Sequence, residues 1–167
     1  NLVYFPDVAV LRADGSIEVV EIKKSMSEVD RDPLYRGKLN LGASVMASAG
    51  FDFAILDKAA VQREPRLTNA RTICQNRTTM VTTAHRMALL EAIRNCGGTI
   101  DYGEAVATLG TQGNPECSMG RAILHAMIVQ RFVEIDLDKP MTMFSQVKIA
   151  SPVELSLAQA TAHLRDH

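Results

Sequence analysis

Two short runs of β-forming residues, separated by a turn signal, stand near the start of the sequence. Residues 8–11 (VAVL) and 17–22 (IEVVEI) are rich in β-branched side chains, and Asp14-Gly15 lies between them. An Asp-Gly pair between two such runs is a strong signal for a β-hairpin. The pattern therefore predicts a pair of antiparallel strands over residues 8–22.

The apolar positions then change to helical spacing. Between residues 33 and 48 they recur every three or four residues, and Gly50 follows as a stop signal. Residues 51–56 are expected to form a short buried strand, and residues 57–62 and 68–76 short helices. Strand, strand, helix, strand, helix is the order of an α/β domain. The residues that recur at this roughly helical spacing are Leu34, Leu39, Leu41, Val45 and Met46.

An aperiodic run, NRTTMVTT at residues 76–83, interrupts this order. It lacks the spacing of either a helix or a strand, which is typical of a connection. The sequence therefore predicts a domain boundary near residues 76–82, with a first domain over residues 1–79 and a second over residues 80–167.

The second half has a different rhythm. A helix over residues 84–95, with Met87, Leu90, Ala92 and Ile93 inward, ends at Gly97-Gly98. A short extended link follows, and Asp101 with Glu104 predicts a capping box that opens the next helix, to residue 109. The remaining expected elements are a third helix over residues 119–131, strands over residues 133–137 and 143–149, and a C-terminal helix over residues 151–164. Helix, short strand, two helices and a two-stranded ribbon is the order of a winged helix.

Composition changes this picture little. The 167 residues are 47% hydrophobic and carry a net charge of −1, an ordinary composition for a soluble globular protein. No apolar run approaches the roughly 20 residues of a membrane helix, and we expect a cytoplasmic protein without a membrane partner. Cys74, Cys96 and Cys117 are odd in number and lack CxxC spacing, which predicts reduced, mostly buried thiols.

The hairpin carries the candidate chemistry. Strand side chains alternate, so Glu21 and Lys23 share a face. A three-residue loop over residues 13–15 would place Asp7 opposite Glu21, whereas a two-residue Asp14-Gly15 loop would pair Val8 with Glu21 and turn Asp7 away. The sequence leaves both loops open, and a catalytic site requires the first.

Two carboxylates and a lysine on one face suit phosphodiester hydrolysis. Asp7 and Glu21 would bind Mg²⁺, or Mn²⁺ in its place, with the Ile22 backbone carbonyl and waters completing the coordination. Such an ion activates water and neutralises charge on the scissile phosphate, and Lys23 would orient the water or contact the phosphate. The alternative is a solvated strand face whose ion pair contributes little.

Pro6-Asp7 followed by Glu21-Ile22-Lys23 resembles the PD-(D/E)XK nuclease motif. The strand over residues 51–56, the segment DKAAVQREPRLTNARTICQNR at residues 57–77 and the winged-helix order together resemble TnsA-type transposon endonucleases over nearly the whole chain. The resemblance implies a restriction-endonuclease-like α/β domain joined to a winged helix. Its catalytic residues would be Asp7, Glu21 and Lys23.

Proteins of this family are nuclease subunits of heteromeric transposases. They cut the 5′ strand at transposon ends, a DDE-class partner subunit cuts and joins the 3′ strand, and an AAA+ regulator controls both. The resemblance implies the same role in DNA transposition here. Two other functions stay open: a noncatalytic adaptor with a degenerate nuclease fold, and another PD-(D/E)XK nuclease of repair or phage origin.

The family also carries a metal-binding Glu on a helix upstream of the hairpin, and six residues precede Asp7 here. We therefore expect a truncated PD-(D/E)XK domain without its first helix and first strand. The abrupt start NLVYFP favours a fragment of a longer protein over a reduced, inactive domain.

Candidate DNA-backbone contacts in the first domain are Lys24, Arg36 and Lys38. In the second domain the third helix offers Arg121, Gln130 and Arg131 among apolar residues, while acidic residues interrupt the ribbon strands. After residue 79 there are seven basic against nine acidic residues. We expect the winged helix to bind protein rather than read DNA.

Overall fold

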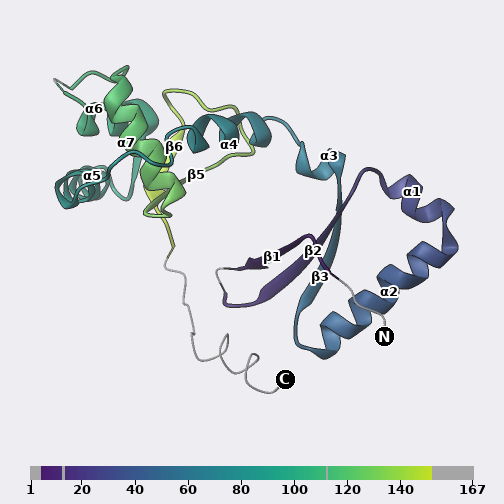
Figure 1. Cartoon of the computed structure of the whole chain (residues 1–167). Coiled ribbons are helices and arrows are strands. Elements are labelled where there is room, and N and C mark those ends of the chain that lie inside the picture. The colour runs from purple at the N-terminus through teal and green to yellow at the C-terminus, as the bar shows by residue number, and fades with distance from the viewer. Residues whose placement is uncertain (1–4, 13, 112, 152–167) are drawn as a thin grey trace. The chain divides into compact units, whose positions relative to one another are not determined.

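A computed structural model describes residues 5–12, 14–111 and 113–151, and these divide into two compact units after Gln62. Helices and small sheets occur in both units (Figure 1), which confirms the α/β class. The first unit contains β1 (Val8–Leu11), β2 (Ile17–Lys23), α1 (Met26–Arg31), α2 (Pro33–Ser48), β3 (Asp52–Asp57) and α3 (Lys58–Val61). The second contains α4 (Arg66–Cys74), α5 (Thr83–Asn95), β4 (Thr99–Asp101), α6 (Tyr102–Leu109), α7 (Ser118–Val129), β5 (Val133–Ile135) and β6 (Gln146–Ile149).

The first unit is built on a sheet of order β1-β2-β3, in which β1 is antiparallel to β2 and β2 is parallel to β3. The β1–β2 register pairs Leu11 with Ile17, and the turn closes through the Arg12 N–H, which donates to the Ser16 carbonyl at 2.8 Å. Gly15 has φ 85°, a left-handed conformation that glycine adopts without steric cost. This register confirms the three-residue loop over residues 13–15.

The crossover between the parallel strands consists of α1 and α2. Asp32 caps α2 by accepting from the Leu34 and Tyr35 N–H groups, each at 3.0 Å, and Pro33 occupies the first helical turn. The predicted bounds of α2 are confirmed. Of the apolar residues that recur at helical spacing along α2, Leu39 is buried whereas Leu34 is 81% exposed.

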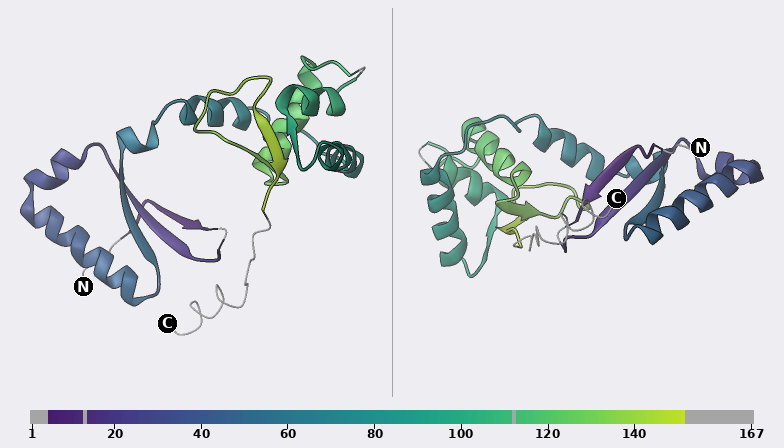
Figure 2. Two further views of the ribbon diagram at one scale, coloured as in Figure 1. Left: turned by 180° about the vertical axis from the view of Figure 1, so that it is seen from behind. Right: turned by 60° about the horizontal axis from the view of Figure 1, so that its bottom comes forward.

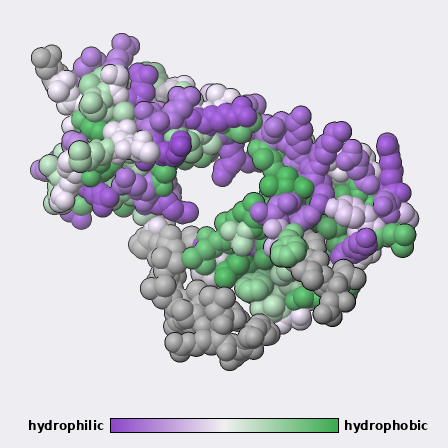
Figure 3. Space-filling model, in the orientation of Figure 1, coloured by the Kyte–Doolittle hydropathy of each residue, from purple (hydrophilic) through white to green (hydrophobic). Residues whose placement is uncertain are grey.

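Strand alternation gives this sheet two different faces. Val19, Glu21 and Lys23 share one face of the central strand, while Val20 and Ile22 lie on the other. The helix α2 packs against the edge strand β3 (Figure 2). Figure 3 shows apolar side chains gathered over the strands of this sheet.

The second unit is built on an antiparallel sheet of order β4-β6-β5 together with α5, α6 and α7. These elements follow the order predicted for the second half of the chain. The core is fully buried and consists chiefly of Leu89, Ile93, Val106, Leu124, Met127 and Val147. In α5 the predicted inward position of Met87 is wrong, because this side chain is exposed and Leu89 takes its place in the core.

Helix α4 also belongs to the second unit, although the sequence placed it in the first domain. The buried Asn69 amide donates to the Leu137 carbonyl at 2.9 Å and to the Lys139 carbonyl at 2.8 Å. Ile73 is buried on the same side of the helix, and α4 packs against α7. The division after Gln62 therefore precedes the boundary predicted at residues 79–80.

Two smaller expectations are also corrected. The predicted capping box of α6 does not form, because Asp101 makes no side-chain cap bond and instead accepts from the Gln146 amide. The cysteines are not mostly buried, since Cys74 and Cys96 are exposed and Cys117 is partly exposed. The helix predicted over residues 151–164 falls almost wholly outside the described residues. Within the described part of the chain, every helix is too short or too polar to cross a bilayer.

Candidate active site

The β1–β2 register decides whether Asp7 can join the predicted site. Val8 pairs with Val20, so continuing the antiparallel register by one residue places Asp7 opposite Glu21. Asp7 Oδ2 accepts a hydrogen bond from the Ile22 N–H at 2.8 Å. The structure thus brings Asp7 against the Glu21-Ile22 segment, as a shared site requires.

Glu21 and Lys23 form the inner part of this site on the central strand. Lys23 Nζ contacts Glu21 Oε1 in an ion pair, and the Lys23 side chain is 18% exposed. Glu21 as a residue is only 7% exposed, far below what is usual for a glutamate. A carboxylate this buried is stable when it is paired, and Lys23 supplies the positive charge.

Lys23 also has an aromatic neighbour in the first unit. Its ammonium lies over the Tyr35 ring, 5.1 Å from the ring centroid. Burial by itself would lower the pKa of Lys23, but hydrogen bonds with Glu21 and Tyr35 outweigh burial and raise the pKa above its ordinary value. Lys23 is therefore a cation at neutral pH, suited to stabilise negative charge and unsuited to accept a proton.

The donor chemistry of the site fits a hard divalent ion. Asp7 and Glu21 offer carboxylate oxygens from adjacent strands, and Mg²⁺ is commonly held by only one or two carboxylates while it keeps several waters. Among the residues that the structure describes, no group of three or more His, Cys, Asp or Glu side chains could hold a metal ion. A metal at this site would therefore be held by two carboxylates, and the Ile22 carbonyl stays a predicted third ligand.

One acidic residue at the same end of the sheet was not predicted. Asp57 is the register partner of Lys23 on the parallel strand β3. Its Oδ1 accepts from the Ala60 N–H at 2.9 Å, so this carboxylate caps α3. An Asp between a β-forming run and a helical run is the sequence signal that could have identified it.

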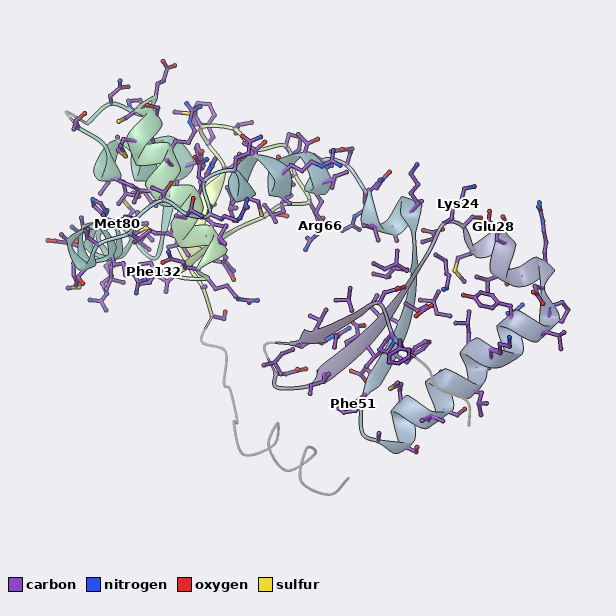
Figure 4. All side chains as sticks on the ribbon, in the orientation of Figure 1. Lys24, Glu28, Phe51, Arg66, Met80 and Phe132 are labelled. Atoms are coloured by element: carbon purple, nitrogen blue, oxygen red, sulfur yellow. The ribbon has the colours of Figure 1, made fainter. Side chains whose placement is uncertain are left out.

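The predicted DNA-backbone residues are exposed and partly paired. Lys24 and Glu28 lie beside each other at the start of α1 (Figure 4) and form an ion pair at 3.8 Å. Arg36 pairs with Asp30 at 3.2 Å, and Lys38 is exposed on α2. Exposed pairs of this kind contribute little to stability, so their cationic groups can exchange partners.

The second unit contains a buried polar cluster around His125. The imidazole is 1% exposed; its Nδ1 lies 2.9 Å from the Asn76 amide nitrogen and its Nε2 lies 2.7 Å from the Tyr102 hydroxyl. With Asn76 donating to Nδ1, the neutral ring carries its proton on Nε2 and donates it to Tyr102. The cluster joins the segment after α4 to α6 and α7, which makes His125 a packing residue.

Burial sets the protonation of this cluster. Burial, and to a smaller extent the positive charge of Arg121, lowers the pKa of His125 to about 4, while the Thr72 backbone partly opposes the shift. Burial also raises the pKa of Tyr102 to about 12. Both groups are neutral near pH 7, which suits a structural hydrogen-bond network.

Several acidic residues of the predicted winged helix have basic partners within the second unit. Asp138 accepts from Arg63 at 2.7 Å, and Glu134 pairs with Lys148 at 2.9 Å. Gln130 accepts from the Arg86 guanidinium at 2.9 Å. The negative charges of Glu134 and Asp138 are therefore partly neutralised by their basic partners.

Asp136, Arg121 and Arg131 complete the set of predicted residues in the second unit. Asp136 forms an ion pair with Lys139 at 3.1 Å. Arg131 has φ 56° and directly follows Gln130, the C-cap of α7. Arg121 is exposed on α7 and lowers the pKa of His125, as described above.

No family model, curated protein or solved structure matches this chain.

Proposed function

We propose that this chain is a metal-dependent DNA endonuclease of the TnsA type, the nuclease subunit of a heteromeric transposase. The first unit would be a restriction-endonuclease-like PD-(D/E)XK domain and the second a winged helix. The observation that carries the proposal is the hairpin register, which sets Asp7 opposite Glu21 beside the cation of Lys23. Of the two loops that the sequence allowed, only the observed one permits this arrangement.

The proposed site assigns separate tasks to its residues. Asp7 and Glu21 would hold Mg²⁺, and a bound ion would ionise a water and offset charge on the scissile phosphate. Lys23, a cation with a raised pKa, would bind the nonbridging phosphate oxygen or orient the water as a hydrogen-bond donor. It would not remove the proton from the water, because its amine is already protonated.

A nicking assay tests this division. Wild-type full-length chain and the variants Asp7→Ala, Glu21→Ala and Lys23→Ala would be incubated with supercoiled DNA and DNA carrying transposon ends, in Mg²⁺ or Mn²⁺. We expect each variant to lose at least about 100-fold in rate, the scale typical of a removed electrostatic or acid–base contribution. Calorimetric titration with Mg²⁺ should show weaker binding for Asp7→Ala and Glu21→Ala but not for Lys23→Ala.

The matched control is Glu18→Ala. Glu18 lies on β2 like Glu21 but on the opposite face, where it pairs with Arg12. This variant should cut DNA at the wild-type rate. Equal cutting by the wild type and all four variants, or loss of cutting in Glu18→Ala to the same extent as in Glu21→Ala, would reject the assigned site.

The second unit would bind the DDE transposase subunit or the AAA+ regulator. After residue 79 the chain has seven basic against nine acidic residues, a balance that does not favour the binding of DNA phosphates. Pull-down of purified candidate partners by the whole chain, with and without transposon-end DNA, tests this assignment. Salt-sensitive DNA binding that maps to α7 would instead favour DNA recognition.

A noncatalytic adaptor is the second candidate function. It is favoured by the internal partners of both carboxylates: Asp7 accepts from the Ile22 N–H, and Glu21 pairs with Lys23. Residues paired in this way could simply stabilise the hairpin. An adaptor would bind its partners equally well in the wild type and in Asp7→Ala, and would cut DNA in neither form.

A further inference from the structure

Tyr35 contacts the proposed catalytic lysine from outside the hairpin. It is on α2, twelve residues beyond Lys23 in the sequence, and its ring centroid lies 5.1 Å from Lys23 Nζ. A lysine ammonium within about 6 Å of an aromatic ring centroid is attracted by the negative face of the ring. The attraction is stronger where water is partly excluded, and the Lys23 side chain is largely buried.

The start of α2 fixes where this ring lies. Asp32 accepts from the Tyr35 N–H at 3.0 Å, and Pro33 restricts the backbone of the first turn. Tyr35 is therefore held at a capped helix end rather than in a free loop. The packing of α2 against β3 connects this helix to the sheet that carries Lys23.

A lysine side chain needs such a support if its ammonium is to act at one position. It is long and loses rotamer entropy when it is fixed. Glu21 and Tyr35 contact the ammonium here. If Glu21 also serves as a metal ligand, its carboxylate is shared, and the ring remains as a support that is independent of the metal.

We propose that Tyr35 is a positioning residue that holds the Lys23 ammonium at the cleavage site through the face of its ring. The inference rests on the proposed endonuclease function and adds to it a residue outside the nuclease motif. It assigns the larger part of the effect to the aromatic ring and the smaller part to the hydrogen bond between the Tyr35 hydroxyl and Lys23. Phenylalanine should therefore largely replace Tyr35, and leucine should not.

Kinetics of Tyr35→Phe and Tyr35→Leu test the proposal. Tyr35→Leu should lower kcat for DNA nicking about tenfold with the KM for DNA unchanged, since the variant keeps Lys23 and loses only its positioning. Tyr35→Phe should stay within about threefold of wild type. The control is Leu34→Ala, because Leu34 is the neighbouring helix residue and is 81% exposed; it should leave both constants unchanged.

A spectroscopic measurement detects the contact between Lys23 and Tyr35 without requiring that the protein cut DNA. Lysine amines would be dimethylated with carbon-13 reagent, and the Lys23 signal would be assigned by its absence from Lys23→Arg. A ring below the ammonium should shift this signal upfield in wild type and in Tyr35→Phe, and the shift should vanish in Tyr35→Leu. An unchanged Lys23 signal in Tyr35→Leu would overturn the inference whether or not the protein cuts DNA.

The two proposals fail differently. If wild type cuts DNA and Tyr35→Leu has the same kcat, Tyr35 has no positioning role and the endonuclease proposal stands. If wild type does not cut DNA under any metal condition, both the endonuclease proposal and the positioning role fail, even when the ring shift is present. A lower kcat together with a lost ring shift in Tyr35→Leu, and neither change in Tyr35→Phe, supports both.

Discussion

Acid should destabilise the second unit through His125, and the structure gives both the sign and the size of the effect. In the folded protein the pKa of His125 is about 4, against an ordinary value of 6.5. Between these values the unfolded chain binds a proton at this residue and the folded chain does not. The contribution is therefore fully present above about pH 6.5 and is lost as the pH falls towards 4.

The magnitude follows from the shift in pKa. At about 1.4 kcal/mol per pH unit, the difference between 6.5 and about 4 corresponds to roughly 3 kcal/mol of unfolding free energy. Protonation would place a charge in a site that is 1% exposed and would set an Nδ1–H donor against the Asn76 amide donor. A loss of this size is a large fraction of the stability of a small unit.

The assay is urea unfolding of the whole chain at several pH values between about 7 and about 4, followed by methyl NMR signals of the second-unit core. The perturbing variant is His125→Gln, whose amide can accept from Asn76 and donate to Tyr102 but does not titrate. We expect it to be less stable than wild type near pH 7 and to lose less stability in acid. The matched control, His85→Gln, should keep the wild-type pH dependence.

Two results would refute the reasoning. One is a parallel loss of unfolding free energy in wild type and His125→Gln across the acid range, which would assign the effect to carboxylates common to both proteins. The other is an NMR titration of the His125 ring in the native protein with a midpoint near 6.5. Either result would show that burial does not keep this imidazole neutral.

Three further predictions concern packing and capping. Gly120→Ala should lower stability by about 1–3 kcal/mol or more, because the added Cβ would lie 2.2 Å from the Val106 carbonyl oxygen. Gly37→Ala should instead stabilise by about 0.5–1 kcal/mol, because a Cβ at this position of α2 would meet no neighbouring atom within 4 Å. Thermal melts of the two variants would be compared. Asn69→Ala should cost about 2–3 kcal/mol by leaving two carbonyls without its amide, whereas Asp138→Ala, which removes only exposed ion pairs, should cost less than about 1 kcal/mol in the same urea titrations. Asp32→Ala should lower the stability of the first unit by about 1 kcal/mol through loss of the α2 cap; an unchanged urea midpoint in that variant would contradict the capping argument.

Local sequence signals predicted much of the first unit because its turns and caps are specified by neighbouring residues. The Asp14-Gly15 turn fixed where β1 and β2 meet, and the start of α2 at Pro33 follows from the cap at Asp32. The loop length could not be decided, since Asp-Gly suits both candidate loops. That ambiguity determines whether Asp7 is in the site, and only the observed pairing of the strands resolves it.

Long-range contacts explain the errors. Helix α4 is polar along much of its length, and nothing in its spacing shows that Asn69 will bond to carbonyls 68 and 70 residues away. Asp101 is of a residue type that commonly caps helices, but Gln146 on the neighbouring strand β6 donates to its carboxylate, which makes no bond to the backbone of α6. Helical spacing alone likewise could not show that Leu34 would face away from the core.

The contact between Lys23 and Tyr35 was equally hidden from the sequence. Alternation along β2 placed Glu21 and Lys23 on one face, and this part of the site was predictable. Which helix residue would lie over that face depends on how the crossover returns to β3. The local sequence therefore specifies the charges of the site, while the tertiary fold supplies the ring beside them.

The membership of α4 in the second unit has a practical and an evolutionary consequence. A fragment cut at the aperiodic run, after residue 79, would remove Asn76 from His125 and expose the surface that Ile73 covers. A fragment that begins after Gln62 would keep both. If the second unit was ever recombined with a different partner domain, the exchanged segment had to include α4 and the residues after it. Asn69 and Asn76, which hydrogen-bond to the Leu137 and Lys139 carbonyls and to His125, lie there.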